Sequence, residues 1–126
     1  MTAGEKIKLA HTGDRSVRNL LIKDNNRVVA LSVLKNPKLT EQEVVRTISS
    51  TSVSEEIIRE IANSRQWMKC YNVKCAMAFN PHTPLNFSLK IIDYLREREL
   101  KQLAKSKGIP GALVNAASRK LKLKKR

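Results

Sequence analysis

Aromatic side chains are scarce in this sequence and make up only 4% of its 126 residues. Acidic residues are also few, with 11 Asp and Glu against 25 Lys and Arg. No apolar run reaches the roughly 18 residues that a transmembrane helix needs. The opening residues, MTAGEKIKLAHTGD, lack the apolar segment of a secretory signal. The sequence therefore predicts no transmembrane segment and no secretion signal.

Side chains that commonly carry catalysis or bind metals are equally sparse. Cys70 and Cys75 would lie about 140° apart around a helix, and His11 and His82 are the only histidines. We therefore expect the cysteines to pack in the core and expect no metal site. The four glycines form no phosphate-binding loop, and no hydrolase or metalloprotease motif is present. The sequence predicts no catalytic residue, no enzyme activity and no cofactor.

The sequence does contain enough apolar side chains for one folded domain. Apolar residues make up 41% of the chain, more than highly charged disordered chains contain, and the length is typical of a single domain. We expect an α-helical repeat domain over residues 1–118 and a basic C-terminal tail over residues 119–126. Two cysteines and no secretory signal favour a reducing compartment, so we expect a cytoplasmic and, most simply, bacterial protein.

An internal repeat organises the chain. Residues 29–37 (VALSVLKNP) and residues 73–81 (VKCAMAFNP) are apolar segments that both end in Asn-Pro, 44 positions apart. Residues 58–65 (IREIANSR) resemble residues 100–107 (LKQLAKSK) at an offset of 42. Two units of about 43 residues therefore follow one another, and a period in the forties is typical of α-helical repeat proteins.

Helix start and stop signals support an all-α chain. Pro37 cannot continue the helix that precedes it, and Thr40 with Glu43 has the spacing of a capping box. Further helix starts are expected at Asp14, Ser54, Pro84 and Pro110, with each proline at the first helical position. Alternating strand patterns are absent. We therefore expect about nine short helices and no sheet.

Helices of about 8–14 residues are unstable alone in water, so the repeats must stack and bury one face of each helix. The apolar residues expected in this core are Leu20, Leu21, Val29, Val33, Val45, Ile48, Ile58, Ile61, Val73, Met77, Leu89, Ile92, Leu100 and Leu103. The last helix should close one end of the stack with Leu113, Val114, Ala117 and Leu121, and it should leave Arg119, Lys120 and Lys122 outside.

Three segments carry a resemblance to known repeat proteins: residues 34–40 (LKNPKLT), 80–84 (NPHTP) and 103–110 (LAKSKGIP). With the repeat, they resemble HEAT-like repeats and the leucine-rich-repeat-variant class, and the stretch from Glu5 to Leu121 resembles a small bacterial helical-repeat family of no established activity. The resemblance implies a short right-handed α-solenoid. HEAT-like proteins mostly act as binding scaffolds, and a bacterial branch excises alkylated DNA bases.

Base excision requires a carboxylate and aromatic surfaces beside the damaged base. Asp93 next to Tyr94 is the only acidic and aromatic pair of neighbours, and Trp67 and Tyr71 lie one turn apart. We instead expect Trp67, Tyr71 and Tyr94 to pack between repeats, as amphipathic aromatics commonly do. The sequence therefore favours binding over catalysis.

Positive charge is the strongest functional signal, because the net charge is +14. Residues 97–126 alone hold ten Lys and Arg against two Glu. Such an excess is commonly offset by an anionic partner. The alternative is that the basic tail is a solvated segment that only keeps the protein soluble. The candidate binding residues are Lys69, Lys74, Lys90, Lys101, Lys105, Lys107, Arg119, Lys120, Lys122, Lys124, Lys125 and Arg126.

Three partners use the same charges. Nucleic acid would be bound through its phosphates without sequence specificity, and the few aromatics favour duplex over single-strand contact. The alternative is a protein-interaction scaffold that binds an acidic or helical partner in the groove of the solenoid. Peripheral membrane contact is less favoured because the tail lacks Trp and Phe.

Overall fold

The computed structural model describes residues 2–50 and 52–124, with the side chain of Lys124 left undescribed. These residues form ten α-helices and one 3-10 helix and contain no strand, which confirms the all-α class. The helices are α1 (Ala3–Thr12), α2 (Arg15–Leu21), α3 (Arg27–Val33), α4 (Glu41–Ser49), α5 (Glu55–Ala62), α6 (Arg65–Met68), α7 (Tyr71–Phe79), α8 (Leu85–Ile91), η1 (Ile92–Tyr94), α9 (Glu97–Ala104) and α10 (Gly111–Lys124). The short α6, which Ser64 caps, makes the number larger than the expected nine.

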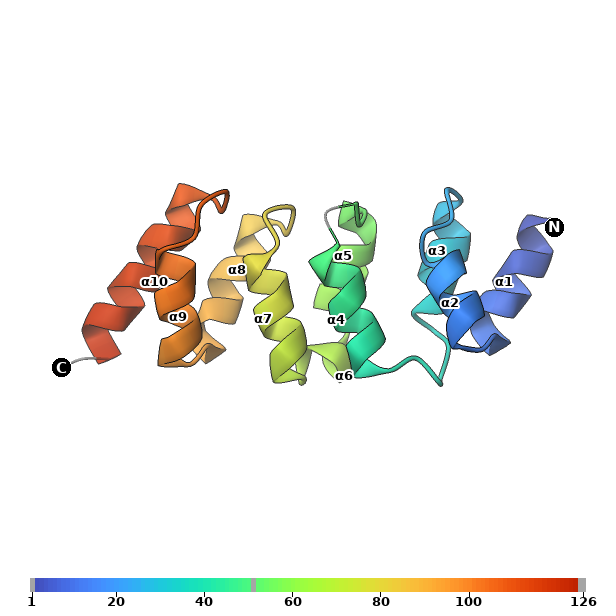
Figure 1. Cartoon of the computed structure of the whole chain (residues 1–126), viewed down its shortest axis with the longest axis horizontal. Helices are drawn as coiled ribbons and strands as arrows, with labels where there is room; N and C mark the ends of the chain where they lie inside the picture. The colour runs from blue at the N-terminus through green and yellow to red at the C-terminus, as the bar shows by residue number, and fades with distance from the viewer. Residues whose placement is uncertain (1, 51, 125–126) are drawn as a thin grey trace.

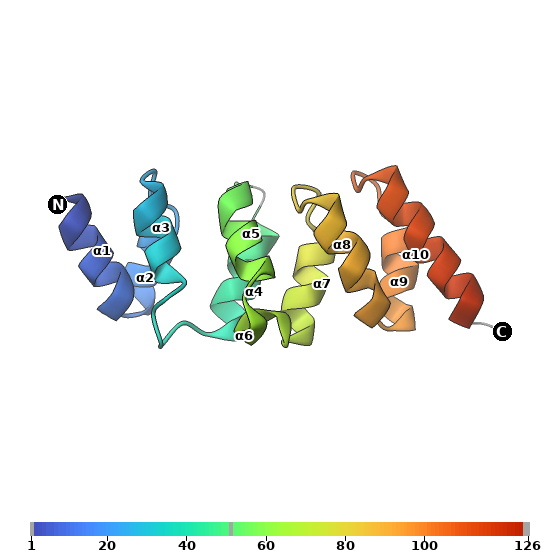
Figure 2. The ribbon, with the colours of Figure 1, turned by 180° about the vertical axis from the view of Figure 1, so that it is seen from behind.

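The helices form an elongated stack of two layers (Figure 1). Helices α2, α4, α7 and α9 lie in one layer, and Figure 2 shows α1, α3, α5, α8 and α10 in the other. Chain direction alternates from one long helix to the next, so the turns lie along two opposite edges. Helices α1 and α10 lie at opposite ends of the stack.

The two Asn-Pro segments make the same buried contacts. The Asn36 amide donates to Ala10 O at 3.0 Å and Gly13 O at 3.1 Å, and its Oδ1 accepts from Lys38 N. The Asn80 amide donates to Ile48 O, and its Oδ1 accepts from His82 N. Each asparagine therefore joins the turn after its own helix to the end of an earlier helix, and the sequence repeat is also a repeat of hydrogen bonds.

The repeated units are inverted with respect to each other. Each unit contributes three long helices, α3–α4–α5 and then α7–α8–α9. Because direction alternates and three is odd, the α3–α4 turn lies at the lower edge in Figure 1 and the α7–α8 turn at the upper edge. Equivalent residues of the two units therefore lie on opposite edges of the stack.

Most of the expected helix starts are observed. Thr40 and Glu43 form the capping box, and Asp14 and Ser54 accept from Val17 N and Ile57 N. Both prolines differ from the prediction, because each precedes its helix: Pro84 is the N-cap of α8, which begins at Leu85, and α10 begins at Gly111, after Pro110. Each proline still fixes the backbone that leads into its helix.

The core contains most of the residues expected there. Leu20 is a wrong prediction: it is 73% exposed, because Arg18 and Leu21 occupy the buried side of α2. Leu89 is also wrong, at 37% exposed, because α8 buries Ser88 and Ile91 instead. Val45 is only half-buried. An apolar pattern on a seven-residue helix thus leaves the inward face poorly defined.

Helix α10 closes one end of the stack. Leu113 and Ala117 are buried, and Arg119 and Lys122 are exposed, as expected. Val114 and Leu121 are only half-buried, and Lys120 is half-buried instead of outside, where it pairs with Asp93. The helix continues through the expected domain boundary at residue 118 and ends at Lys124. Residues 119–124 therefore extend the last helix as a basic helical segment.

A buried ion pair joins the first three helices to the rest of the stack. The Arg18 guanidinium on α2 donates to Glu43 Oε1 at 3.0 Å and Oε2 at 3.2 Å, and both side chains are at most 7% exposed. Burial alone would raise the pKa of Glu43, but the Thr40 N–H and the Arg18 guanidinium lower it overall. The carboxylate form is therefore the one that the fold stabilises.

Replacing Glu43 with Gln should lower the free energy of unfolding by about 3 kcal/mol, because Arg18 would remain buried without its counter-charge. A lowered pKa stabilises the fold above the ordinary value of 4.5, and the contribution is lost as pH falls through the folded-state pKa. The difference between wild type and E43Q in urea unfolding should therefore narrow only below pH 4.5. Glu41→Gln, in the same helical turn, is the matched control, and an equal loss in both variants would contradict the prediction.

Replacing Asn80 with Ala should also destabilise the fold, by about 1–3 kcal/mol, because the buried carbonyl of Ile48 would lose its donor. Asn86→Ala, an exposed position on α8, is the control and should change stability little. Thermal unfolding of both variants measures the difference. Equal midpoints would show that the buried amide contributes nothing.

Candidate functional site

Uncompensated positive charge is concentrated in the second half of the stack. Residues 69–122 hold eleven Lys and Arg but only three acids, Asp93, Glu97 and Glu99. Each of these acids already pairs with a cation: Asp93 with Lys120, Glu97 with Lys101 and Glu99 with Arg98. The cations of this half with no acidic partner among the described residues are Lys69, Lys74, Lys90, Arg96, Lys105, Lys107, Arg119 and Lys122.

The predicted binding residues are mostly at the surface. The exposed ones are Lys69, Lys90, Lys101, Lys105, Lys107, Arg119 and Lys122. Lys74 and Lys120 are half-buried because each contacts another side chain. The side chain of Lys124, and all of Lys125 and Arg126, lie outside the described residues.

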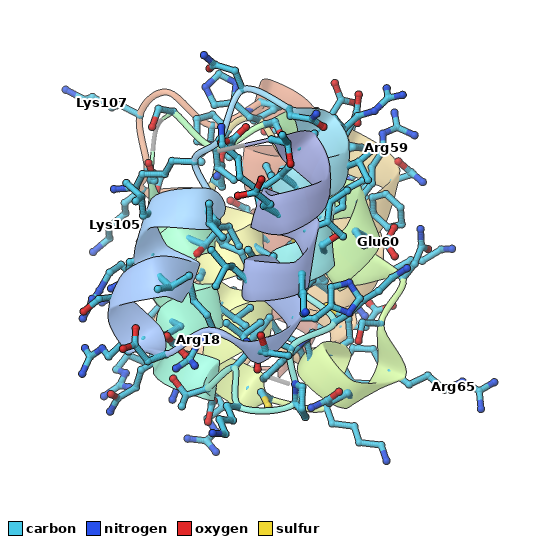
Figure 3. The ribbon with its side chains drawn as sticks, turned by 90° about the vertical axis from the view of Figure 1, so that its right-hand side faces the viewer. Arg18, Arg59, Glu60, Arg65, Lys105 and Lys107 are labelled. Carbon is cyan, nitrogen blue, oxygen red and sulfur yellow. The ribbon has the colours of Figure 1, made fainter. Side chains whose placement is uncertain are left out.

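These residues do not form one continuous patch. Lys105 and Lys107 lie at the α9–α10 turn, on the upper edge of the stack in Figure 1. In Figure 3 they project from the side opposite to Arg65. Helix α10 ends at the other edge, so Lys122 in its last turn lies far along the helix from this turn. The fold therefore separates the predicted cations into at least two groups.

One group gathers around η1 and includes residues that the sequence reading missed. The Lys74 ammonium lies 4.5 Å from the centre of the Tyr94 ring, and Lys120 Nζ lies 2.6 Å from Asp93 Oδ1. Arg96 and Arg98 follow directly, and Arg98 is 80% exposed at its side chain. We call Lys74, Tyr94, Arg96, Arg98 and Lys120 the η1 corner.

The two arginines were missed because Arg96-Glu97-Arg98-Glu99 reads as a neutral, solvated helix start. In the structure Glu99 instead turns inward and is 5% exposed. It accepts a 2.7 Å hydrogen bond from the Tyr71 hydroxyl, which itself accepts from Arg96 N at 2.8 Å. The Arg96 guanidinium lies over the Tyr71 ring at 4.4 Å. The pattern of alternating charges gave no signal of this arrangement.

Tyr71 connects the η1 corner to buried Glu99, because its hydroxyl accepts from Arg96 N and donates to Glu99. Burial and the hydrogen bond to Glu99 raise the pKa of Tyr71 to about 12, despite the opposing Arg96 N–H. The same hydrogen bond, with Arg98, lowers the pKa of Glu99. Burial also raises the pKa of the neighbouring Cys75 thiol. The phenol and thiol are held neutral, which suits a structural role for both.

The aromatic residues divide differently from the expectation that all three pack between repeats. Trp67 is 6% exposed and Tyr71 is half-buried, as expected. Tyr94 is 65% exposed, which contradicts that expectation. Its neighbours Ile92 and Leu95 take the buried positions, at 3% and 1% exposed. The 3-10 turn therefore presents the Tyr94 ring to solvent.

A separate cleft of about 730 Å³ lies between the α2–α3 and α4–α5 parts of the stack. Its lining includes the hydroxyl residues Ser50, Ser52 and Ser54 and the cations Lys23 and Arg46. None of the nine predicted binding residues whose side chains the structure describes lines it. The cleft is thus a second polar surface, distant along the chain from the η1 corner.

The described residues contain no group of three His, Cys, Asp or Glu side chains that could hold a metal ion. Cys70 and Cys75 are free and half-buried against the core. In this part of the chain no helix is long and apolar enough to cross a bilayer. Comparisons with protein-family models, curated proteins and solved structures returned no match to the chain.

Replacing Tyr71 with Phe should remove a phenol that ionises at about pH 12, measured by absorbance in an alkaline titration. A raised pKa favours the neutral phenol in the fold, so its stabilising effect is complete below pH 10 and is lost as pH rises toward 12. Stability at neutral pH should fall by about 1 kcal/mol with the lost hydrogen bonds. Tyr94→Phe is the control and should keep the phenol that ionises at about pH 12. If that ionisation disappeared in Y94F, its assignment to Tyr71 would be refuted.

Proposed function

We propose that this protein is a non-enzymatic nucleic-acid-binding protein that contacts phosphates through the basic surface of α7–α10. The observation that carries the proposal is the pairing of all three acids in residues 69–122. Eight cations of that half are left with no acidic partner in the part of the chain that the structure describes. Phosphate groups neutralise such cations and release the counterions condensed on the nucleic acid.

The distribution of charge supports a located surface rather than a uniformly basic protein. Residues 2–68 hold as many Lys and Arg as residues 69–122, but they hold eight acids instead of three. The exposed pairs Arg27–Glu56 and Arg59–Glu55 show how cations of the first half are compensated. An anionic polymer would therefore bind more favourably along the second half.

The proposal includes a right-handed α-solenoid of the HEAT-like kind, with α10 as the terminal helix. The elongated two-layer stack of short helices supports it (Figures 1 and 2). Stacked repeats offer long surfaces on which separated cations can contact successive phosphates. The inverted units place such contacts on both edges of the stack.

Replacing Lys90, Arg119 and Lys122 together with Gln should weaken binding to duplex DNA and structured RNA alike. The slope of log affinity against log salt, measured over roughly 50–300 mM, should fall by about 0.9 for each lost phosphate contact on a duplex. Fluorescence anisotropy with labelled nucleic acids measures both quantities. The three residues are exposed, so the fold should be unaffected.

The matched control replaces Lys8, Lys23 and Lys38 with Gln, which removes the same charge from exposed positions of the first half. This control variant should change the slope of log affinity against log salt much less. Equal effects of the two triple variants would show that only net charge matters and would remove the located surface from the proposal. Absence of binding to either nucleic acid at low salt would refute the proposed function itself.

The second candidate function is a protein-interaction scaffold, and the 730 Å³ cleft favours it. Its lining includes the apolar residues Ile22, Leu31 and Ile57. The acids of the lining are paired, Asp24 with Lys6 and Glu56 with Arg27, which leaves the cations Lys23 and Arg46. Such a combination suits an acidic partner segment with some apolar side chains. This candidate would replace the first if nucleic acid failed to bind.

A further inference from the structure

The η1 corner differs from the other basic regions in having an exposed aromatic ring at its centre. Tyr94 is 65% exposed. One face of its ring is covered by the Lys74 ammonium at 4.5 Å. With Ile92 and Leu95 buried on either side, the backbone that carries Tyr94 is fixed to the core. The ring is therefore held in place and still accessible.

Four cations from three different helices contact η1 or follow it directly in the sequence. Lys74 comes from α7, Arg96 and Arg98 from the start of α9, and Lys120 from α10. The salt bridge between Lys120 and Asp93 attaches α10 beside the ring. Because Asp93 is the residue before Tyr94, the ammonium of Lys120 is held close to the tyrosine backbone. Residues distant in the sequence thus converge on one short turn.

The two cations nearest the aromatic rings retain their charge for a partner. Lys74 lies over Tyr94 and Arg96 over Tyr71, at 4.5 and 4.4 Å from the ring centres. A ring orients a cation through its electron-rich face but carries no net charge to neutralise it. These contacts therefore position the cations without satisfying their charge, whereas Arg98 and Lys120 are partly neutralised by Glu99 and Asp93.

A pairing with Lys74 explains why Tyr94 tolerates exposure, but it does not explain why Lys120 and Arg96 are brought to the same short turn. Exposed aromatic rings beside cations are the arrangement by which proteins bind unpaired bases: the base stacks on the ring and the cations contact its phosphates. A duplex offers no such contact, because its bases already stack on one another. Sequence composition favoured duplex contact, since it could not show that one of the few aromatics is exposed within the basic region.

We propose that the η1 corner binds single-stranded nucleic acid, with a base stacked on the open face of Tyr94 and adjacent phosphates on Lys74 and Arg96. Arg98 and Lys120 extend the basic surface on either side. The proposal rests on the proposed function and specifies its substrate as an unpaired strand. Stacking is available on every base, so the site has little sequence specificity.

The experiment compares Tyr94→Leu and Tyr94→Phe with the wild type, using labelled oligothymidine, labelled oligouridine and a DNA duplex. Loss of the ring in Y94L should weaken single-strand binding about five- to a hundredfold. Y94F keeps the stacking surface and should bind nearly as the wild type does. Duplex affinity should be unchanged in both variants. The two oligonucleotides show whether DNA or RNA is preferred, since both offer the same base and phosphate chemistry.

A folding defect can be excluded as the cause of weaker binding, because Tyr94 is exposed and circular dichroism can verify the helical content of each variant. Photo-crosslinking with 5-iodouracil oligonucleotide gives a second measurement, and the crosslink should map to Tyr94. Equal binding of Y94L and wild type to the single strands, or a crosslink confined to other residues, would overturn the inference. Duplex binding would then remain as support for the proposed function. If the wild type bound none of the nucleic acids, both this inference and the proposed function would be refuted.

Discussion

The fold depends on satisfying polar groups that become buried where short helices end. Helices of seven to ten residues have unpaired backbone groups over much of their length. Stacking removes these groups from water, so side chains must replace the solvent. Asn36 and Asn80 do so by donating to carbonyls of earlier helices, and Glu43 does so by accepting from Thr40 while it pairs with Arg18. The same side chains thus end one helix and fix its neighbour.

This structural demand has a consequence for surface charge. The carboxylates of Asp14, Glu43 and Glu99 accept hydrogen bonds from the protein itself, at helix starts or in the interior. Acids used in this way contribute little to compensating exposed lysines. At the start of α9, Glu99 is buried and accepts from both Tyr71 and Arg98, and Glu97 pairs with Lys101, so Arg96 has no acidic partner within the described residues. Local electrostatics therefore follow from packing as well as from net charge.

The sequence predicted the features that depend on short-range patterns. The capping box at Thr40, the caps at Asp14 and Ser54, the equivalence of the two Asn-Pro segments and most core positions are all found in the structure. It mispredicted Leu20 and Leu89 because a seven-residue helix has too few apolar positions to define its buried side. It also missed Arg96 and Arg98, because the inward turn of Glu99 depends on Tyr71, 28 positions earlier. Contacts of that range are set by the stacking of helices and leave no local signature.

The η1 corner shows why the arrangement of cations matters more than their number. A flexible lysine or arginine loses side-chain entropy when it binds a phosphate, and this loss opposes binding. Contact with an aromatic ring already restricts Lys74 and Arg96, so less freedom remains to be lost. The exposed basic side chains of α10 have no such restraint within the described residues and attract anions mainly by their field. A partner is therefore drawn to the whole basic half but is held most firmly where rings orient the charges, which is around Tyr94.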